Sequence, residues 1–386
     1  MDKEQVLAIA NNEASPFYLY DLCVIENKVK QIMASFPEFR LLYSIKANPH
    51  PSIVKHLANM GLGFDAASVN EVQLALNQGG MSDSVFYSAP GKTIRDLDAT
   101  LDCCEIIADS INELNRLNCL AHSAECKIRV GVRLNVMNTK ITQSTNEIMG
   151  GVASKFGISI EDFNTLNMEK LPNIDVVGVH IYFGSQLLDV KLIINNFHII
   201  ANTVLSMKCI KNIQYINFGG GFGIPYEKSE FCLDIKQLSD LLHNDLQFQE
   251  LNQTSIRLNL ELGRYLVAEC GYFITRILDV KNSYGKKFAI IDGGMNTFYR
   301  PIMTGNFHEI VQFNTNGESE IVTLVGKLCT PIDKYYEDIA LYPLSVDDII
   351  AFKNAGAYGF SMSLLEFISH DRPKEILIWG KSHELN

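Results

Sequence analysis

The stretch Leu-Tyr-Ser-Ile-Lys-Ala-Asn at residues 42–48 ends an apolar, strand-forming run at a single lysine. Pro49 and Pro51 prevent the run from continuing, so Lys46 is expected at the carboxyl end of a buried strand. Burial lowers the pKa of an amine, which favours a nucleophile that can form a Schiff base with a carbonyl group. On these residues alone, a lysine that extends from a strand end into solvent is the commoner arrangement.

This run is the first of eight strand-like runs, and helical patterns such as 52–60, 69–78, 111–121 and 235–251 lie between most of them. Alternating strand and helix patterns predict a parallel sheet. Eight repeats over roughly 235 residues fit a closed (β/α)8 TIM-like barrel better than an open α/β sheet, which remains the alternative. The eight runs are 40–46, 62–67, 85–89, 105–109, 127–135, 175–183, 213–218 and 255–261.

The pattern changes after residue 263. The segments 271–281, 287–292, 321–325 and 348–352 are strand-like, with little helix between them, and they predict a β-rich second domain built as a sandwich or barrel. An early strand at 17–20 could join that sheet. The expected domains are therefore a barrel at 26–263 and a β-domain made of 1–25 and 264–386.

Composition excludes several classes of protein. The net charge is −11, with no basic cluster, which argues against nucleic acid and anionic membrane surfaces as partners. No apolar run reaches the roughly 18 residues of a membrane span, and the first residues lack the pattern of a secretory signal. The nine cysteines show no metal-site spacing and fit reduced thiols, so a cytoplasmic protein without a metal is expected.

Polar residues gather at the ends of the predicted strands, where a barrel places its chemistry. The run Gly219-Gly220-Gly221 follows a strand, and backbone amides without side chains can approach a phosphate closely. The chain has neither a nucleotide P-loop nor a dinucleotide fingerprint. A phosphate site near Lys46 indicates pyridoxal 5′-phosphate (PLP), and Glu261 would keep the pyridine nitrogen of this cofactor protonated.

The sequence resembles the fold-type III PLP-dependent decarboxylases, which include diaminopimelate, ornithine and arginine decarboxylases. The resemblance implies a barrel with a C-terminal β-domain, working as a head-to-tail homodimer with active sites shared at the interface. The motifs that carry it are Tyr-Ser-Ile-Lys-Ala-Asn at 43–48, Phe-Asp-Ala-Ala-Ser at 64–68, His-Ile-Tyr-Phe-Gly-Ser-Gln at 180–186, Gly-Gly-Gly-Phe-Gly at 219–223, Glu-Leu-Gly-Arg at 261–264, Asp-Gly-Gly-Met-Asn at 292–296, Cys-Thr-Pro-Ile-Asp at 329–333 and Gly-Ala-Tyr-Gly at 356–359.

The resemblance also implies a role for each matching residue. Lys46 would carry the cofactor, with Asp65 nearby and Arg133 supporting the ring. Cys329, supplied by the partner subunit, would reprotonate the α-carbon after CO2 has left. The phosphate would be bound by Gly219, Gly220, Gly221 and Ser185, with Tyr358 closing that site. The substrate would be met by Arg264, Arg300, Thr330, Asp333 and Tyr358, where the two arginines suit a distal carboxylate.

Two departures from the family pattern bear on the substrate. The residue expected to stack on the cofactor ring is usually histidine, but here it is Tyr182, and His180 lies one strand step away; either could cover the ring. Thr330 stands where the diaminopimelate and ornithine enzymes usually carry an acid that reads a distal ammonium group, so a free diamino acid is less favoured.

The Cys-Thr-Pro variant at 329–331, together with Asn-Ala-Gly-Ala-Tyr-Gly at 354–359 and Phe-Ile-Ser-His at 367–370, resembles a branch of the family that acts on conjugated amino acids. One type decarboxylates citryl-diaminopropionate in siderophore biosynthesis, and we favour this substrate because a citryl group offers carboxylates to the arginines. The alternatives are glutamate tethered to a carrier protein, then diaminopimelate in lysine biosynthesis. An amino-acid racemase and a non-catalytic regulator stay open as less favoured classes.

Overall fold

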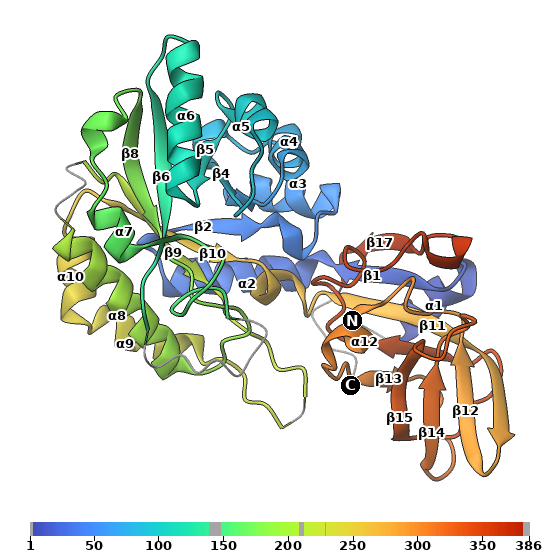
Figure 1. The fold of residues 1–386 in the computed structure, drawn as a ribbon. Helices are drawn as coiled ribbons and strands as arrows, with labels where there is room; N and C mark the ends of the chain where they lie inside the picture. The colour runs from blue at the N-terminus through green and yellow to red at the C-terminus, as the bar shows by residue number, and fades with distance from the viewer. Residues whose placement is uncertain (1–2, 139–147, 208–211, 228, 381–386) are drawn as a thin grey trace. The chain divides into compact units, whose positions relative to one another are not determined.

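The computed structural model describes residues 3–138, 148–207, 212–227 and 229–380 (Figure 1). The chain forms two compact units. A barrel unit comprises 30–224 and 232–263, and a β unit comprises Met1–Val29, Pro225–Phe231 and Arg264–Asn386. The predicted boundaries, at 26 and 263, lie close to these, but the sequence did not single out the segment 225–231.

The barrel unit contains a closed parallel sheet, which confirms the predicted (β/α)8 architecture. Eight strands each pair in parallel with two neighbours, and the pairing of β5 with β6 closes the ring, while the short β7 (Ile158–Ser159) attaches to β6. The eight strands are β2 (Phe39–Ser44), β3 (Gly63–Ala66), β4 (Val85–Ser88), β5 (Glu105–Ala108), β6 (Ile128–Asn135), β8 (Ile174–His180), β9 (Tyr215–Gly220) and β10 (Arg257–Leu262).

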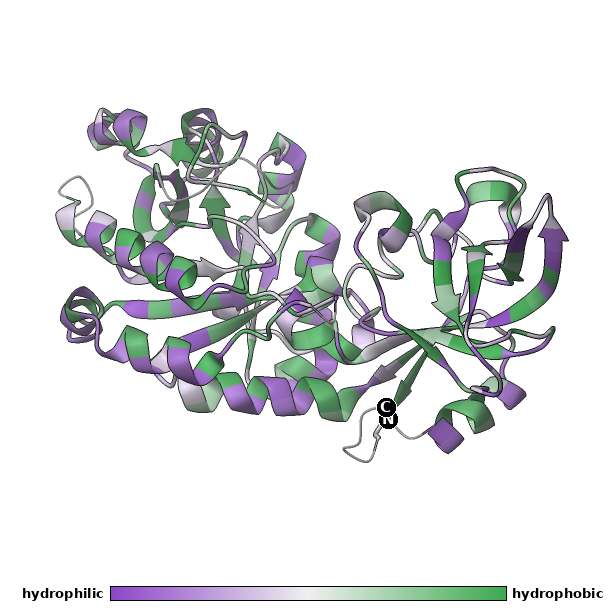
Figure 2. Cartoon of the chain, turned by 90° about the horizontal axis from the view of Figure 1, so that it is seen from below, coloured by the Kyte–Doolittle hydropathy of each residue, from purple (hydrophilic) through white to green (hydrophobic). Residues whose placement is uncertain are grey.

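Amphipathic helices surround this sheet, and each carries both polar and apolar residues (Figures 1 and 2). The predicted helix 235–251 is two helices, because the Asp245 carboxylate accepts the N–H groups of Gln247 and Phe248 and starts a new helix there. The helices are α2 (Leu22–Ser35), α3 (Pro51–Asn59), α4 (Val69–Asn77), α5 (Ile94–Thr100), α6 (Ile111–Ser123), α7 (Ile160–Asn164), α8 (Val190–Ser206), α9 (Ile235–His243) and α10 (Leu246–Asn252).

The ring of Tyr215 fills part of the barrel interior. A Cβ at Gly178 would lie 1.9 Å from this ring, and one at Gly131 would lie 2.2 Å from its hydroxyl oxygen. Leu42 and Phe86 belong to the same buried cluster. The barrel is therefore a packed core, which leaves the carboxyl ends of its strands as the place for polar groups.

The β unit is built on a mixed sheet, and the predicted early strand is part of it. β1 (Phe17–Asp21) pairs antiparallel with β11 (Gly271–Ser283) and parallel with β17 (Lys374–Ile378). The sheet continues through β12 (Lys286–Ile291), β13 (Ile310–Gln312), β14 (Glu320–Val325), β15 (Lys334–Leu341) and β16 (Ile349–Phe352), and the unit also holds α1 (Lys3–Asn12), α11 (Arg264–Val267) and α12 (Arg300–Thr304).

The sequence analysis did not predict three of these strands, and two predicted barrel strands run two or three residues past the observed carboxyl ends. β13 is short, while β15 and β17 carry polar, partly exposed residues that break a simple apolar run. β2 ends at Ser44, so Lys46 stands in the 3₁₀ turn Ile45–Ala47 and not within the strand. β8 ends at His180, so Tyr182 lies beyond the strand. Within the described ranges, none of the helices has the length and apolar character needed to cross a bilayer.

Candidate active site

Lys46 lies directly after β2, and its ammonium group contacts the next strand. Its Nζ is 3.3 Å from the Oδ2 atom of Asp65, and its side chain is 39% exposed, so the buried lysine that the strand pattern predicted is a half-exposed one. Ser88, at the end of β4, donates a hydrogen bond to the other oxygen of Asp65. Asp65 itself is buried, so its orientation is fixed on both sides. The arrangement holds an accessible amine beside a fixed carboxylate.

The glycine run at the end of β9 has a backbone that only glycine fits well. Gly219 and Gly221 have φ angles of +59° and +75°. A Cβ at Gly219 would lie 2.5 Å from the ring of Tyr182, and one at Gly221 would lie 1.9 Å from the carbonyl oxygen of Gly184. Ser185 follows Gly184, so the predicted phosphate-binding serine lies beside the run. Together these segments form a shallow backbone turn of the kind that binds phosphate.

Glu261 points into a buried polar cluster at the barrel mouth. Its Oε1 atom accepts a 2.7 Å hydrogen bond from Asn217, and its Oε2 atom is 3.4 Å from Nε2 of His180. Burial by itself would raise the pKa of Glu261, but His180, Lys46 and Asn217 outweigh it and lower this pKa to about 2. Glu261 is therefore ionised at all working pH values.

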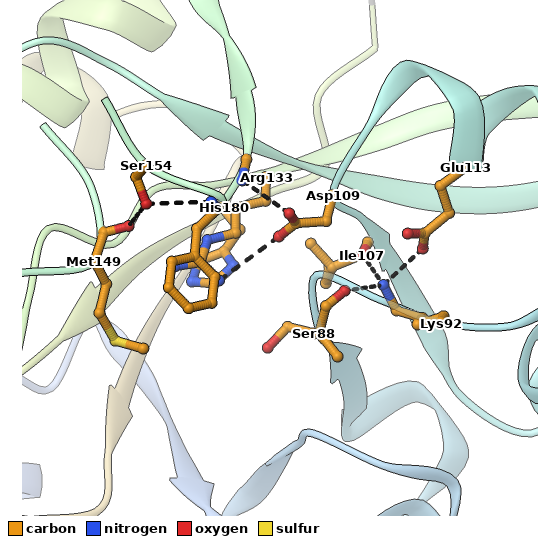
Figure 3. Close-up of polar contacts among 12 residues, drawn as sticks. Ser88, Lys92, Ile107, Asp109, Glu113, Arg133, Met149, Ser154 and His180 are labelled. Atoms are coloured by element: carbon orange, nitrogen blue, oxygen red, sulfur yellow. Dashed lines mark hydrogen bonds and ion pairs between the residues drawn. The ribbon is translucent and has the colours of Figure 1, made fainter. Parts of the chain in front are cut away.

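Arg133 extends from β6 and contacts both an acid and aromatic rings (Figure 3). Its Nη1 atom is 3.7 Å from Asp109 Oδ1, and its guanidinium lies 4.6 Å from the ring centre of Phe156 and 6.0 Å from that of Tyr182. Asp109 also accepts a 2.9 Å hydrogen bond from Gly157 N–H. The structure thus places Arg133 beside Tyr182, near the end of the neighbouring strand β8.

A second lysine, Lys92, is buried at the ends of β4 and β5 and was not found from the sequence (Figure 3). Its Nζ atom donates to the carbonyl oxygens of Ala89 and Ile107, both at 2.8 Å, and to Glu113 at 2.6 Å. Burial lowers the pKa of Lys92 and raises that of Glu113, while their mutual attraction opposes both shifts. Unlike Lys46, Lys92 is enclosed, so it serves the barrel structure.

In the β unit, two buried arginines surround two tyrosine rings. Arg264 donates a 3.1 Å hydrogen bond to the hydroxyl of Tyr226, and Arg300 contacts the sulfur of Met362 at 3.7 Å. Both guanidiniums lie 5.0–5.9 Å from the ring centres of Tyr226 and Tyr358. Tyr358 has a φ of +62°, which is strained for a tyrosine and typical of functional positions. We refer to these four residues (Arg264, Arg300, Tyr226 and Tyr358) as the arginine cluster.

His308 is a buried histidine that packs beside the arginine cluster. Its ring packs against that of Tyr226, with the ring centres 5.0 Å apart. Burial, followed by the positive charges of Arg300 and Arg264, lowers the pKa of His308 to about 3, although a contact with the carbonyl of Lys353 opposes the shift. His308 is thus neutral, so it adds no positive charge to that of the two arginines.

Cys329 lies on an exposed loop whose shape depends on Asp333. The two Asp333 carboxylate oxygens accept hydrogen bonds from the N–H groups of Met295 at 2.7 Å and Leu328 at 2.9 Å. Asp333 N–H in turn donates to the carbonyl of Thr330. Asp333 is buried, so its observed contacts organise the loop that carries Cys329 and Thr330, while its predicted contact with substrate stays a prediction.

The predicted site residues therefore fall into two groups, each held within one unit. The sequence did not single out the polar residues that contact members of these groups or interact with them electrostatically: Ser88, Lys92, Asn217, Tyr226 and His308. Asn217 lies two residues before the glycine motif, whereas the other four carry no motif of their own and come to the site through the fold. The barrel group is Lys46, Asp65, Arg133, His180, Tyr182, Ser185, Gly219, Gly220, Gly221 and Glu261; the β-unit group is Arg264, Arg300, Cys329, Thr330, Asp333 and Tyr358.

The barrel group fits PLP on its own chemistry. An accessible amine beside a carboxylate suits an aldehyde, and the glycine turn suits a phosphate. An ionised, buried carboxylate suits a protonated pyridine nitrogen, and Glu261 is ionised. Whether Tyr182 or His180 covers the ring stays open; His180 already contacts Glu261, whereas Tyr182 lies over the glycine turn.

Comparison with known proteins agrees with this chemistry. A family model described as the pyridoxal binding domain of pyridoxal-dependent decarboxylases matches residues 22–268. The crystal structure of diaminopimelate decarboxylase from Helicobacter pylori, complexed with L-lysine, has a TM-score of 0.86 at 27% identity, covering 97% of this chain and 94% of that one.

Two relatives are named for substrates that are conjugated amino acids. The L-glutamyl-[BtrI acyl-carrier protein] decarboxylase of Niallia circulans is 32% identical over 100% of this chain and 94% of its own length. The 2-[(L-alanin-3-ylcarbamoyl)methyl]-2-hydroxybutanedioate decarboxylase of Staphylococcus aureus is 29% identical over 94% and 93%. The predicted cofactor and enzyme class are confirmed: this chain belongs to the family of pyridoxal-dependent amino-acid decarboxylases.

Proposed function

We propose that the chain decarboxylates an amino acid that is conjugated to a carboxylate-bearing group, with citryl-diaminopropionate as the favoured substrate. The arginine cluster carries this proposal, because two buried guanidiniums beside the same two rings form a site for carboxylates. The proposed context is siderophore biosynthesis, in which such conjugates are made.

The barrel group supports the decarboxylation itself. Bound PLP supplies the electron sink that accepts the electrons left when CO2 departs. Lys46 would hold the cofactor through its amine, and Asp65 fixes the position of that amine. Glu261 stays ionised and would hold the proton on the pyridine nitrogen, while Cys329 would deliver a proton to the α-carbon.

Three observations favour a substrate with distal negative charge. Arg264 and Arg300 place two guanidiniums beside the same two tyrosine rings, and a carboxylate is a natural bidentate partner for a guanidinium. Thr330 offers a hydroxyl where an acid would be needed to bind a distal ammonium group. The Staphylococcus aureus relative is named for a substrate in which an alanine unit is joined by an amide to a hydroxy acid with further carboxylates.

The second candidate is glutamate tethered to a carrier protein. It is favoured by the full-length match to the Niallia circulans relative. A tethered glutamate carries a thioester at its distal carbon, so it offers no carboxylate there for Arg264 and Arg300. Diaminopimelate is third, since its distal end carries an ammonium group as well as a carboxylate, and Thr330 cannot neutralise that charge.

The test is CO2 release from purified protein and PLP with each of three substrates: citryl-diaminopropionate, glutamate on a carrier protein, and diaminopimelate. The proposal predicts a kcat/KM at least about 100-fold higher for the citryl conjugate, the value of roughly two charge-assisted hydrogen bonds. Faster release from either other substrate would contradict it. Loss of optical rotation without CO2 would instead identify a racemase.

A further inference from the structure

We propose that Asn217 is a positioning residue that joins the two ends of the cofactor site, because one amide side chain holds both the Glu261 carboxylate and the backbone of the glycine turn. Its Nδ2 atom donates to Glu261 Oε1 at 2.7 Å, and its Oδ1 atom accepts the Gly219 N–H at 2.9 Å. The inference requires the family cofactor but not the proposed substrate.

The placement of Asn217 allows it to serve both groups. It lies on β9 between β8 and β10, in register with His180 on one side and with Asn259 on the other. It is fully buried, so both hydrogen bonds are protected from water. Asn217 therefore links the position of the Glu261 carboxylate to the start of the glycine turn through one side chain.

An amide makes both of these bonds without charge at any pH. An amide has a donor and an acceptor on one planar group, whereas a carboxylate has acceptors alone. An ionised carboxylate at position 217 would keep the bond from Gly219 but would repel Glu261. Asn217 is also among the groups that keep the pKa of Glu261 low, after His180 and Lys46. The residue thus supports the charge on Glu261 as well as its position.

The hydrogen bond from Gly219 N–H to Asn217 also determines the structural role of Gly219. The Gly219 N–H already has an acceptor within the protein, and its φ of +59° brings the backbone close to Tyr182. Gly219 therefore sets the direction in which the chain enters the turn. Asn217 fixes that direction, so the amides that follow reach a phosphate from a preset position.

Asn259 offers a matched control. It is an asparagine in the neighbouring register position, equally buried, and neither atom of its amide has a hydrogen-bond partner among the described residues. Replacing either asparagine with leucine removes an amide of similar size from the barrel interior. Only the change at Asn217 removes contacts to Glu261 and Gly219.

The experiment measures PLP binding by equilibrium dialysis of the full chain after the cofactor has been removed, without substrate. Asn217→Leu should weaken PLP binding by roughly 10- to 100-fold, and Asn259→Leu by less than about twofold. Thermal unfolding of each cofactor-free variant shows whether it is folded. Equal affinities for the two folded leucine variants would overturn the proposal.

A second variant tests the donor alone and does not depend on how well leucine packs. In Asn217→Asp, the introduced carboxyl group can still donate to Glu261 while it is protonated, but it cannot once it is ionised. PLP binding by this variant should therefore weaken as pH rises, relative to wild type, with His180 and Lys46 facing the same carboxylate in both proteins. An affinity that follows the wild-type pH profile would contradict the role of Asn217. Failure of wild type itself to bind PLP would instead contradict the assigned cofactor.

Discussion

The barrel site and the arginine cluster arrange their charged side chains differently. At the barrel mouth, charged groups of opposite sign face each other, Lys46 with Asp65 and Arg133 with Asp109, and His180 lies beside Glu261. In the β unit, the two arginines share the same tyrosine rings, and burial, together with their charge, lowers the pKa of the neighbouring His308.

From this difference we infer which site serves the cofactor that the family shares and which one selects the substrate. A site that is balanced internally can hold a cofactor that is the same in every reaction. A cluster of two neighbouring guanidiniums suits a ligand that brings negative charge. We therefore assign cofactor binding to the barrel and substrate choice to the β unit.

The largest effect is expected from Cys329, the proposed proton donor. Because Cys329 lies in the β unit, a loss of rate would show that this unit also contributes to the chemical step. Cys329→Ala should slow decarboxylation by roughly 10²- to 10⁴-fold, the usual contribution of a general acid, while PLP stays bound. Steady-state kinetics and the absorbance of the bound cofactor measure the two quantities. A variant with full rate and unchanged product stereochemistry would remove Cys329 from the mechanism.

The same cysteine tests the proposed homodimer. If Cys329 serves the site of the partner subunit, mixing inactive Lys46→Ala and Cys329→Ala proteins should restore activity, since a hybrid dimer has one intact site. Full exchange at equal concentrations would give roughly a quarter of the wild-type activity. No recovery in mixtures shown to contain hybrid dimers would place Cys329 and Lys46 of one site on the same subunit.

A smaller effect is expected from the arginine cluster. Arg300→Met should lower kcat/KM for the citryl conjugate by about 10- to 100-fold, the value of a charge-assisted hydrogen bond pair, with little change in PLP binding. Arg276→Met is the control, because Arg276 lies in the same unit but donates to the backbone carbonyls of Asp347 and Ala10. Equal losses in the two variants would contradict the assignment of substrate choice to the cluster.

The smallest effect on the reaction, and the clearest one on stability, concerns Lys92. Lys92→Met leaves Glu113 buried without its cation and should lower the free energy of unfolding by roughly 3–5 kcal/mol. The folded-state pKa of Glu113 is already above its ordinary value, so the folded form binds a proton more tightly than the unfolded one. The loss of stability in Lys92→Met should therefore become smaller as the pH falls and Glu113 becomes protonated.

Urea unfolding at several pH values measures this loss, and Lys92→Met/Glu113→Leu is the matched variant that removes both charges. It should recover part of the stability at neutral pH. If Lys92→Met loses the same free energy of unfolding at every pH and the double variant recovers none of it, the buried charge of Glu113 is not the cause of the loss.

The sequence was sufficient where a pattern is local. Alternating apolar runs and helical periods predicted the closed barrel, and the short motifs located Lys46, Glu261 and the glycine turn. It was insufficient where structure depends on partners distant in the chain. The exposure of Lys46 follows from its 3₁₀ turn, and the bond from Asn217 to Glu261 depends on the pairing of β9 with β10.

The arginine cluster shows the same limit. Arg264 and Arg300 follow recognisable motifs, but Tyr226 and His308 come from segments without one. Tyr226 meets the arginines because the segment 225–231 folds with the β unit, to which His308 also belongs. Similarly, the polar strand β15 has no clear apolar alternation, since much of its surface is exposed.

The central claim is that Lys46, and not the buried Lys92, binds PLP covalently. Borohydride reduction of the PLP-loaded protein followed by peptide mass spectrometry tests this directly. The account predicts one phosphopyridoxyl group on the peptide that contains Lys46, and none after Lys46→Ala. A stable modification of Lys92, or no modification of wild type at saturating PLP, would contradict it.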